Sequence, residues 1–222
     1  MKRAVVFFLV LAFVPAATLA AQWTGMPVWN DPTGGTGIVL AADWGMPNAD
    51  AGNGDAYGGR VSLGLGTVTL TGGVASYKPD GYNDATTTYG GQLAFRLIGG
   101  SLSPVAVNLQ VGAGTSGAIT SGTTPYPHVT TVIGAVGISV PLPTPGVSIE
   151  GFFSPGARYH ELTERGPGLP NTSTTKFGYS VGGNLGFGTL GIHLAYDYEK
   201  TDAGSNGIFG LGLHFALRPS GL

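Results

Sequence analysis

Large apolar side chains alternate with polar or small ones along most of the chain. They fall on odd-numbered positions from Phe177 to Phe187 and, after Gly188-Thr189, on even-numbered positions from Leu190 to Tyr198. Successive side chains of a β-strand point to opposite faces of the sheet. The alternation therefore predicts two strands joined by a tight turn, with one apolar face and one polar face.

The same alternation recurs in ten segments between Thr36 and Leu217, and none of them shows the 3.6-residue spacing of an amphipathic helix. Short connections such as Gly66-Thr67 alternate with longer loops rich in Gly, Asn, Asp, Pro and Thr. This arrangement predicts an all-β fold, a closed antiparallel up-and-down transmembrane β-barrel of about ten strands. Merging or losing one hairpin would give eight strands.

The polar face carries as many positive as negative side chains, and few of the long charged side chains that a soluble exterior displays. We therefore expect the apolar face to meet lipid and the polar face to line the lumen, where the charges form ion pairs that fill the interior. Arg96 and Glu150 are expected near the short-turn end and the other six near the loop end. The expected lumen charge network consists of Asp43, Arg60, Arg96, Glu150, Arg158, Lys176, Asp197 and Glu199.

Aromatic residues cluster at the strand ends next to the long loops. Amphipathic rings at one level are typical of a membrane–water interface, whereas a soluble core would spread them along the strands. We expect an aromatic girdle formed by Trp44, Tyr57, Tyr77, Tyr89, Tyr126, Tyr159, Tyr179, Tyr196 and Tyr198.

The N-terminus has the features of a secretory signal peptide. Lys2 and Arg3 precede an apolar run from Ala4 to Val14, and small residues follow up to Ala21. We therefore divide the chain into a signal peptide, residues 1–21, and a barrel domain, residues 22–222. Removal of the signal peptide would leave 8 Lys and Arg against 12 Asp and Glu. This mild negative charge gives no reason to expect nucleic acid as a partner.

Several short motifs have weak chemical meaning here. The chain has no cysteine, and its four histidines show no spacing typical of metal ligands, so we expect no metal and no cofactor. The segment Gly178 to Gly182 matches the G-x-S-x-G motif, but it lies within a strand. Counting from the Gly188-Thr189 turn places Ser180 opposite Asp197 and His193 opposite Asn184, which leaves Ser180 without an adjacent histidine. His193 and His214 are expected near the short-turn end as hydrogen-bonded lumen residues.

In strand pattern and loop lengths the chain resembles small outer-membrane β-barrel proteins of the OmpA/OmpX-like kind, which typically have eight strands. The resemblance implies the outer membrane of a diderm bacterium as the location, reached by export through the inner membrane. Outer-membrane lipid and the barrel-assembly machinery would be the partners, and any protein partner is unknown. Following this family, the assembly signal would lie in the alternating segment from Phe209 to Leu217.

Three functions remain open from the sequence. The first is a non-enzymatic barrel with a structural or surface role, and the second is a small passive channel for ions or small solutes. The third is a rim hydrolase similar to the omptin proteases, for which Asp80, Asp84 and the His160-Glu161 step are the candidate residues.

Overall fold

The computed structural model describes residues 36–99, 103–119, 126–163, 168, 170–202 and 204–217. The expected signal peptide lies outside these residues. Within them, almost every residue belongs to one of ten strands, with one short 3₁₀ helix between the first two. The elements are β1 (Thr36–Pro47), η1 (Ala49–Ala51), β2 (Asp55–Leu65), β3 (Val68–Lys78), β4 (Thr86–Ile98), β5 (Ala106–Ser116), β6 (His128–Thr144), β7 (Val147–Thr163), β8 (Thr172–Phe187), β9 (Leu190–Lys200) and β10 (Ser205–Leu217).

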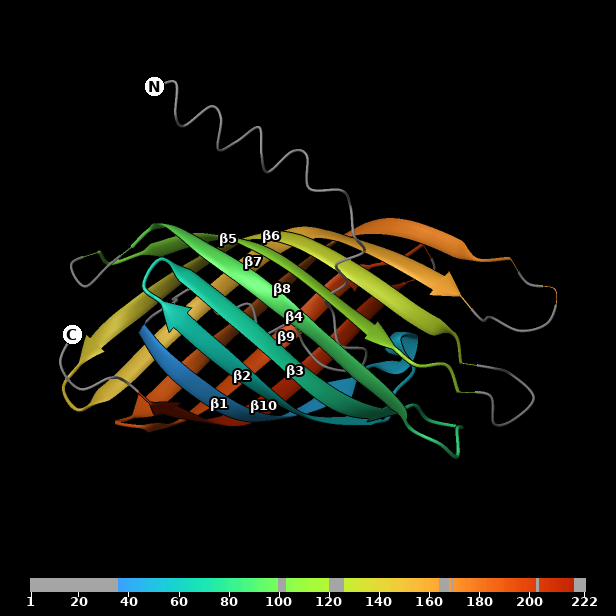
Figure 1. Ribbon diagram of the computed structural model, residues 1–222, viewed down its shortest axis with the longest axis horizontal. Helices are drawn as coiled ribbons and strands as arrows, with labels where there is room; N and C mark the ends of the chain where they lie inside the picture. The colour runs from blue at the N-terminus through green and yellow to red at the C-terminus, as the bar shows by residue number, and fades with distance from the viewer. Residues whose placement is uncertain are drawn as a thin grey trace, which may run out of the picture.

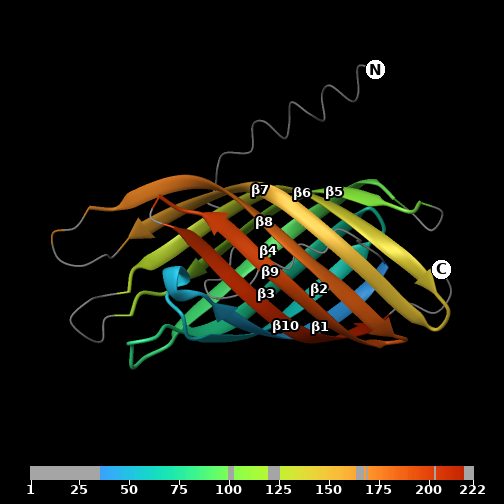
Figure 2. The same cartoon turned by 180° about the vertical axis from the view of Figure 1, so that it is seen from behind.

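The ten strands form one closed barrel (Figures 1 and 2). Each strand pairs with its neighbour in the sequence, and β1 closes the ring by pairing with β10. Every pairing is antiparallel, and the closing pair runs from Ile38 opposite Leu217 to Pro47 opposite Ile208. The ten-strand, up-and-down barrel expected from the sequence is confirmed, and the alternative of eight strands is wrong.

The connection between β6 and β7 is tighter than the sequence indicates. Its prolines suggest a turn from Pro141 to Gly146, but β6 continues to Thr144, which pairs with Val147 across a two-residue turn. The pairing of β6 with β5 ends where Ala106 meets Ser139. Beyond that point β6 has a strand on one side only, and such an edge tolerates residues that lack a backbone N–H.

The burial pattern is inverted relative to a soluble protein. Large apolar side chains on alternate positions of every strand face outward, as Leu93, Leu109 and Leu211 do at 40–45% exposure. The inward positions hold buried polar and charged side chains, among them Arg158, His193 and Asp197, at 1–2% exposure. Such a barrel satisfies its backbone hydrogen bonds through strand pairing and presents apolar side chains to its surroundings.

The first long connection folds over the loop end of the barrel. Asn48 caps η1 by accepting a hydrogen bond from the Ala51 N–H, and its own N–H donates to the Gly207 carbonyl of β10 at 2.7 Å. The Tyr77 hydroxyl donates to the carbonyl oxygens of Ala51 and Asn53, at 3.0 and 2.9 Å. The connection is thereby tied to strands on both of its sides.

Candidate functional site

A group of hydrogen-bonded polar side chains fills the lumen toward the loop end; we call it the loop-end cluster. At its centre, the Arg158 guanidinium makes a bidentate ion pair with Asp197, with N···O distances of 2.5 and 2.7 Å. The Ser180 hydroxyl donates to the same carboxylate at 2.5 Å. Glu199 lies 3.9 Å from Arg158 and 2.6 Å from His160 Nε2. The cluster consists of Thr131, Arg158, His160, Ser180, Asp197 and Glu199.

A second group, the mid-barrel cluster, consists of Asp43, Arg60, His193 and His214. Arg60 Nε donates to Asp43 Oδ2 at 2.9 Å, and His193 Nε2 lies 2.6 Å from Asp43 Oδ1. The rings of His193 and His214 are stacked, with their Nδ1 atoms 3.1 Å apart. Asp43 and Arg60 were predicted near the loop end, and His193 and His214 near the short-turn end. This separation was wrong, because the strand register brings Asp43 and His193 onto opposite sides of Gly212.

Glycines on the inner face let long side chains cross a neighbouring strand. Arg158 of β7 reaches Asp197 of β9 over β8, where a Cβ on Gly178 would lie 2.7 Å from the guanidinium Cζ. In the same way, the contact between His193 and Asp43 passes over Gly212 of β10, whose Cβ would clash with both side chains. Both clusters therefore depend on glycine in the strand between the partners.

The remaining three members of the expected charge network have other surroundings. Arg96 lies at the short-turn end, as expected, and donates to the Gly66 carbonyl at 2.9 Å. Glu150 also lies near that end, opposite Asn184 of β8. Lys176 binds Asp202 of the β9–β10 connection at 2.5 Å, and this aspartate was not among the eight expected residues.

Uncharged and histidine side chains complete both clusters, although the predicted charge network did not include them. Five side chains supply hydrogen bonds to the charged groups or to one another: Thr131, Ser180, His160, His193 and His214. The expected positions of Ser180 opposite Asp197 and His193 opposite Asn184 are confirmed. An inward polar residue with an inward glycine on the next strand is the signal that could have identified them.

The loop-end cluster contains a chain of groups that resembles part of a hydrolase site. Thr131 Oγ1 lies 2.8 Å from His160 Nδ1, and the other ring nitrogen contacts Glu199. A nucleophile oriented in this way also has to be accessible to substrate. Thr131 is 3% exposed, and Ser180 is fully buried with its hydroxyl bound to Asp197. Thr131 nevertheless lines the loop-end pocket described below, whereas the Ser180 hydroxyl is held away from solvent as a hydrogen-bond partner of Asp197.

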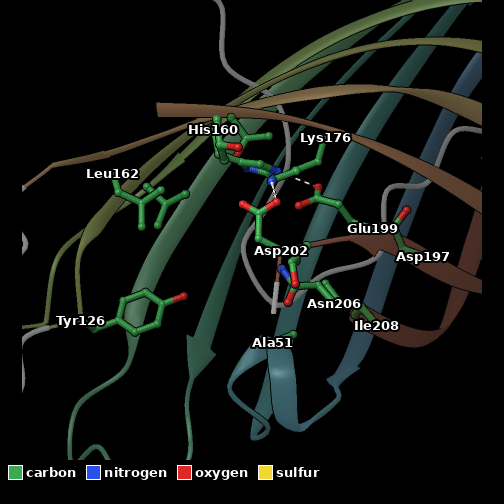
Figure 3. Close-up of a pocket in the computed structure, with 14 residues that line it drawn as sticks. Ala51, Tyr126, His160, Leu162, Lys176, Asp197, Glu199, Asp202, Asn206 and Ile208 are labelled. Carbon is green, nitrogen blue, oxygen red and sulfur yellow. Dashed lines mark hydrogen bonds and ion pairs between the residues drawn. The ribbon is translucent and has the colours of Figure 1, made fainter. Parts of the chain in front are cut away.

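A pocket of about 340 Å³ opens above the loop-end cluster (Figure 3). Its polar side carries His160, Lys176 and Glu199, and Leu162 and Ile208 contribute apolar surface. The Tyr126 hydroxyl points into it. Burial raises the pKa of Tyr126 well above its usual range, so that this hydroxyl stays protonated at neutral pH and can donate a hydrogen bond.

The aromatic girdle is only partly as expected. Tyr57, Tyr89, Tyr159 and Tyr196 face outward with 38–60% exposure. Trp44 stacks on Tyr57 with a centroid distance of 6.5 Å, and Tyr179 stacks on Tyr198 at 5.0 Å.

Two predicted girdle members, Tyr77 and Tyr126, do not belong to the girdle. Tyr77 is fully buried and faces inward, where its hydroxyl binds the β1–β2 connection. Tyr126 packs edge-on against Tyr77 and lines the pocket at the loop end. Tyr77 shares the inward face of β3 with Thr69, Thr71 and Ala75, so the alternation itself places it inside, and its place near the strand end was a misleading guide.

Within the residues that the structure describes, no group of three or more His, Asp or Glu side chains is arranged to hold a metal ion. Over the same residues, no helix combines the length and apolarity needed to cross a bilayer. Among these residues, the contacts found in the polar interior are those between side chains of the chain itself.

The architecture is that of a closed barrel with an apolar exterior and a polar lumen, and solved structures share it. The β domain of the Bordetella autotransporter BrkA is 10% identical with a TM-score of 0.52, covering 82% of this chain and 100% of that chain. The N-terminal β-barrel domain of Pseudomonas aeruginosa OprF is 14% identical (TM-score 0.42; 83% of this chain and 99% of that one). Ail of Yersinia pestis, the attachment invasion locus protein, is 15% identical (TM-score 0.42; 82% and 100%).

The chain thus has a closed antiparallel β-barrel fold, which it shares with the β domain of the autotransporter BrkA, and the barrel that the resemblance implied is confirmed as a fold. No protein-family model matches the chain, and no curated protein sequence matches it either.

Proposed function

We propose that the protein is a non-enzymatic β-barrel of the outer membrane with a structural or surface role, and that its lumen is closed by ion pairs. The observation that carries this proposal is the Arg158–Asp197 pair, whose side chains lie inside the barrel at 1% and 2% exposure. A guanidinium held by two hydrogen bonds and packed in this way would obstruct the lumen at its own level. Both charges are compensated, so the arrangement stabilises the interior instead of selecting one sign of ion.

Membrane lipid around the outward apolar band is part of the same proposal. The barrel-assembly machinery would insert the chain, reading the outward-facing residues of β10 between Phe209 and Leu217 as its signal. The absence of enzymatic activity is also a proposal, supported by the burial of Ser180, whose hydroxyl is held by Asp197.

A small passive channel is the second candidate. The observation in its favour is the pocket of about 340 Å³ at the loop end, which has charged side chains on its wall like the vestibule of a pore. Its continuation into the lumen meets Asp197 and Glu199, both of which line the pocket and belong to the loop-end cluster.

Single-channel conductance in planar bilayers distinguishes the two functions. The protein is refolded in detergent, and its folding is checked by the shift in gel mobility on heating. We expect no discrete current steps from the folded protein. Reproducible steps would overturn the closed-lumen proposal and would favour the channel, with the lumen charges acting on the permeating ions.

A further inference from the structure

The loop-end pocket, which opens above the loop-end cluster, contains a carboxylate oxygen that no contact within the chain satisfies. The contacts of Glu199 with His160 and Arg158 all involve Oε2. Among the described residues, Glu199 Oε1 has no hydrogen-bond or ion-pair partner, although Glu199 is only 5% exposed and lines the pocket. A nearly buried polar atom without a partner costs free energy. This oxygen is therefore the place in the pocket where a donor from outside the chain gains most.

The charges around the pocket favour a cation over an anion. The single guanidinium of Arg158 makes its bidentate pair with Asp197 and lies 3.9 Å from Glu199, so that one positive group faces two carboxylates. Lys176 is bound at 2.5 Å to Asp202, whose side chain is 93% exposed, so this pair lies at the open side of the pocket. Three carboxylates therefore meet two permanently charged bases.

His160 does not have to supply the missing positive charge. In the neutral form of the ring, Nε2–H donates to Glu199 and Nδ1 accepts from the Thr131 hydroxyl, at 2.6 and 2.8 Å. Both ring nitrogens are then satisfied without an additional proton. With a neutral His160, the pocket has one negative charge in excess.

The other walls of the pocket suit an apolar body. Val129 of β6, Leu162 of β7 and Ile208 of β10 line it. The Tyr126 hydroxyl points into it and has no hydrogen-bond partner in the part of the chain that the structure describes (Figure 3). The volume of about 340 Å³ lies at the lower end of the range for small-molecule sites. A ligand for this pocket is therefore small and largely apolar, with one group that donates to a carboxylate.

Contacts around the pocket hold its walls in place. Ala51 of η1 lines the pocket, and its carbonyl accepts from the Tyr77 hydroxyl at 3.0 Å. Next to Ile208, the Gly207 carbonyl accepts from the Asn48 N–H at 2.7 Å, which ties the residue before η1 to β10. A ligand does not have to order these walls, and preformed walls lower the entropic cost of binding.

We propose that the loop-end pocket binds a small organic ammonium ion with an apolar body. The ammonium group donates to Glu199 Oε1, and the apolar body packs against Leu162 and Ile208 (Figure 3). An anion of the same shape would meet an unpaired carboxylate oxygen, and a neutral molecule would leave the excess charge uncompensated. This binding role is additional to the structural one, and it does not require an open lumen.

Calorimetric titration of the folded barrel in a non-ionic detergent tests this proposal. The probes are phenethylammonium and two molecules of similar shape, the neutral 2-phenylethanol and the anion 3-phenylpropionate. The heat of mixing each probe with micelles alone is subtracted. We expect saturable binding of one phenethylammonium ion per wild-type barrel, and about tenfold weaker binding of the other two probes.

Glu199→Gln tests the role of the carboxylate. We expect it to weaken phenethylammonium binding about tenfold and to leave 2-phenylethanol binding unchanged. Glu161→Gln is the matched control, because Glu161 lies next to His160 in β7 but on the opposite face, and does not line the pocket. The shift in gel mobility on heating checks the folding of each variant.

A second pair of variants decides the question if Glu199→Gln does not fold. Lys176→Gln removes a positive charge from the pocket wall and frees an exposed aspartate, so we expect phenethylammonium to bind about threefold more tightly. Lys200→Gln removes the same charge from an exposed lysine that does not line the pocket, and we expect no such gain.

Three results would overturn the proposal. They are equal binding of the three probes by the wild type, equal losses in Glu199→Gln and Glu161→Gln, and equal affinities in Lys176→Gln and Lys200→Gln. Conductance is measured separately in planar bilayers. Current steps count against the closed lumen alone, whereas a lack of selectivity for the ammonium probe counts against the pocket alone.

Discussion

His193 is held by two short contacts that fix where its protons lie. A distance of 2.6 Å between Nε2 and Asp43 Oδ1 requires a proton between them, so Nε2–H donates to the carboxylate. The 3.1 Å contact between the Nδ1 atoms of His193 and His214 requires one proton as well, and has no room for two. One of the two rings therefore donates its Nδ1–H and the other accepts through Nδ1.

The contact with His214 lies among charged and polar neighbours. Asp43 and Arg60 both contact the His193 ring, and Asn184 lies opposite His193 on the adjacent strand. The hydrogen bond between the two rings is therefore a contact between polar groups inside the barrel.

His214→Gln is expected to keep most of the stability of the barrel, because the glutamine side chain can still hydrogen-bond to His193 Nδ1. His214→Leu is expected to cost about 1–3 kcal/mol, because a leucine side chain cannot make this hydrogen bond. Thermal unfolding of both variants in detergent at one pH measures the difference. Equal melting of the two variants would show that the contact between the rings contributes nothing.

At the scale of single strands, β8 contributes an inward glycine that leaves space and an inward serine that donates a hydrogen bond. Gly178 lies between Arg158 and the carboxylates of β9, and no other residue leaves room for the guanidinium at this point. The Ser180 hydroxyl, two residues further on, supplies the third hydrogen bond to Asp197. A strand of small inward residues thus acts as a bridge between two charged strands.

Gly178→Ala is expected to destabilise the barrel by roughly 3–5 kcal/mol, the cost of breaking a buried ion pair. Its Cβ would lie 2.5 Å from the Tyr198 carbonyl oxygen and 2.7 Å from Arg158 Nε. Gly151→Ala is the control, since this exposed glycine of β7 has nothing within 4 Å of the added carbon. Urea unfolding in detergent compares the two, and equal stability of both variants would argue against the bridging role of Gly178.

The sequence predicts the strands well and the interior contacts less well, for a geometric reason. Alternation tells which face each side chain occupies, so the inward position of Arg158 and Asp197 follows from it. The stagger between strands decides which inward residues share a level, and alternation carries no information about it. Asp43 was therefore expected far from His193, and Asp202 was not connected with Lys176.

At the scale of the whole molecule, the exterior of the barrel carries large apolar side chains on every strand. Leu93 and Gln92 of β4 are neighbours in the chain near the middle of the strand, and they face opposite sides. Leu93→Arg is expected to cost about 2–4 kcal/mol in a bilayer, the penalty for a cation on the lipid side at the midplane. Gln92→Arg places the same charge in the lumen and is expected to cost less.

Unfolding in guanidinium from phospholipid vesicles measures both variants. Equal destabilisation would mean that the two faces meet similar surroundings, and that the apolar side is not the lipid side. The fold class was predictable at this scale because it depends on periodicity and on alternating loop lengths. The inward orientation of Tyr77 was predictable too, because it shares a face of β3 with Thr69 and Thr71, but the partners of its hydroxyl were not, because they come from another connection.

The pairing of β1 with β10 has a topological consequence. Ten consecutive residue pairs join these strands, in the same antiparallel manner as every other pair in the ring. Thr36 and Leu217 therefore lie at the same end of neighbouring strands, although almost the whole domain separates them in sequence. Nothing in the ring of strands marks where the chain begins. A circular permutant that links these two strands by a short turn and opens a different turn at the same end should close into the same barrel.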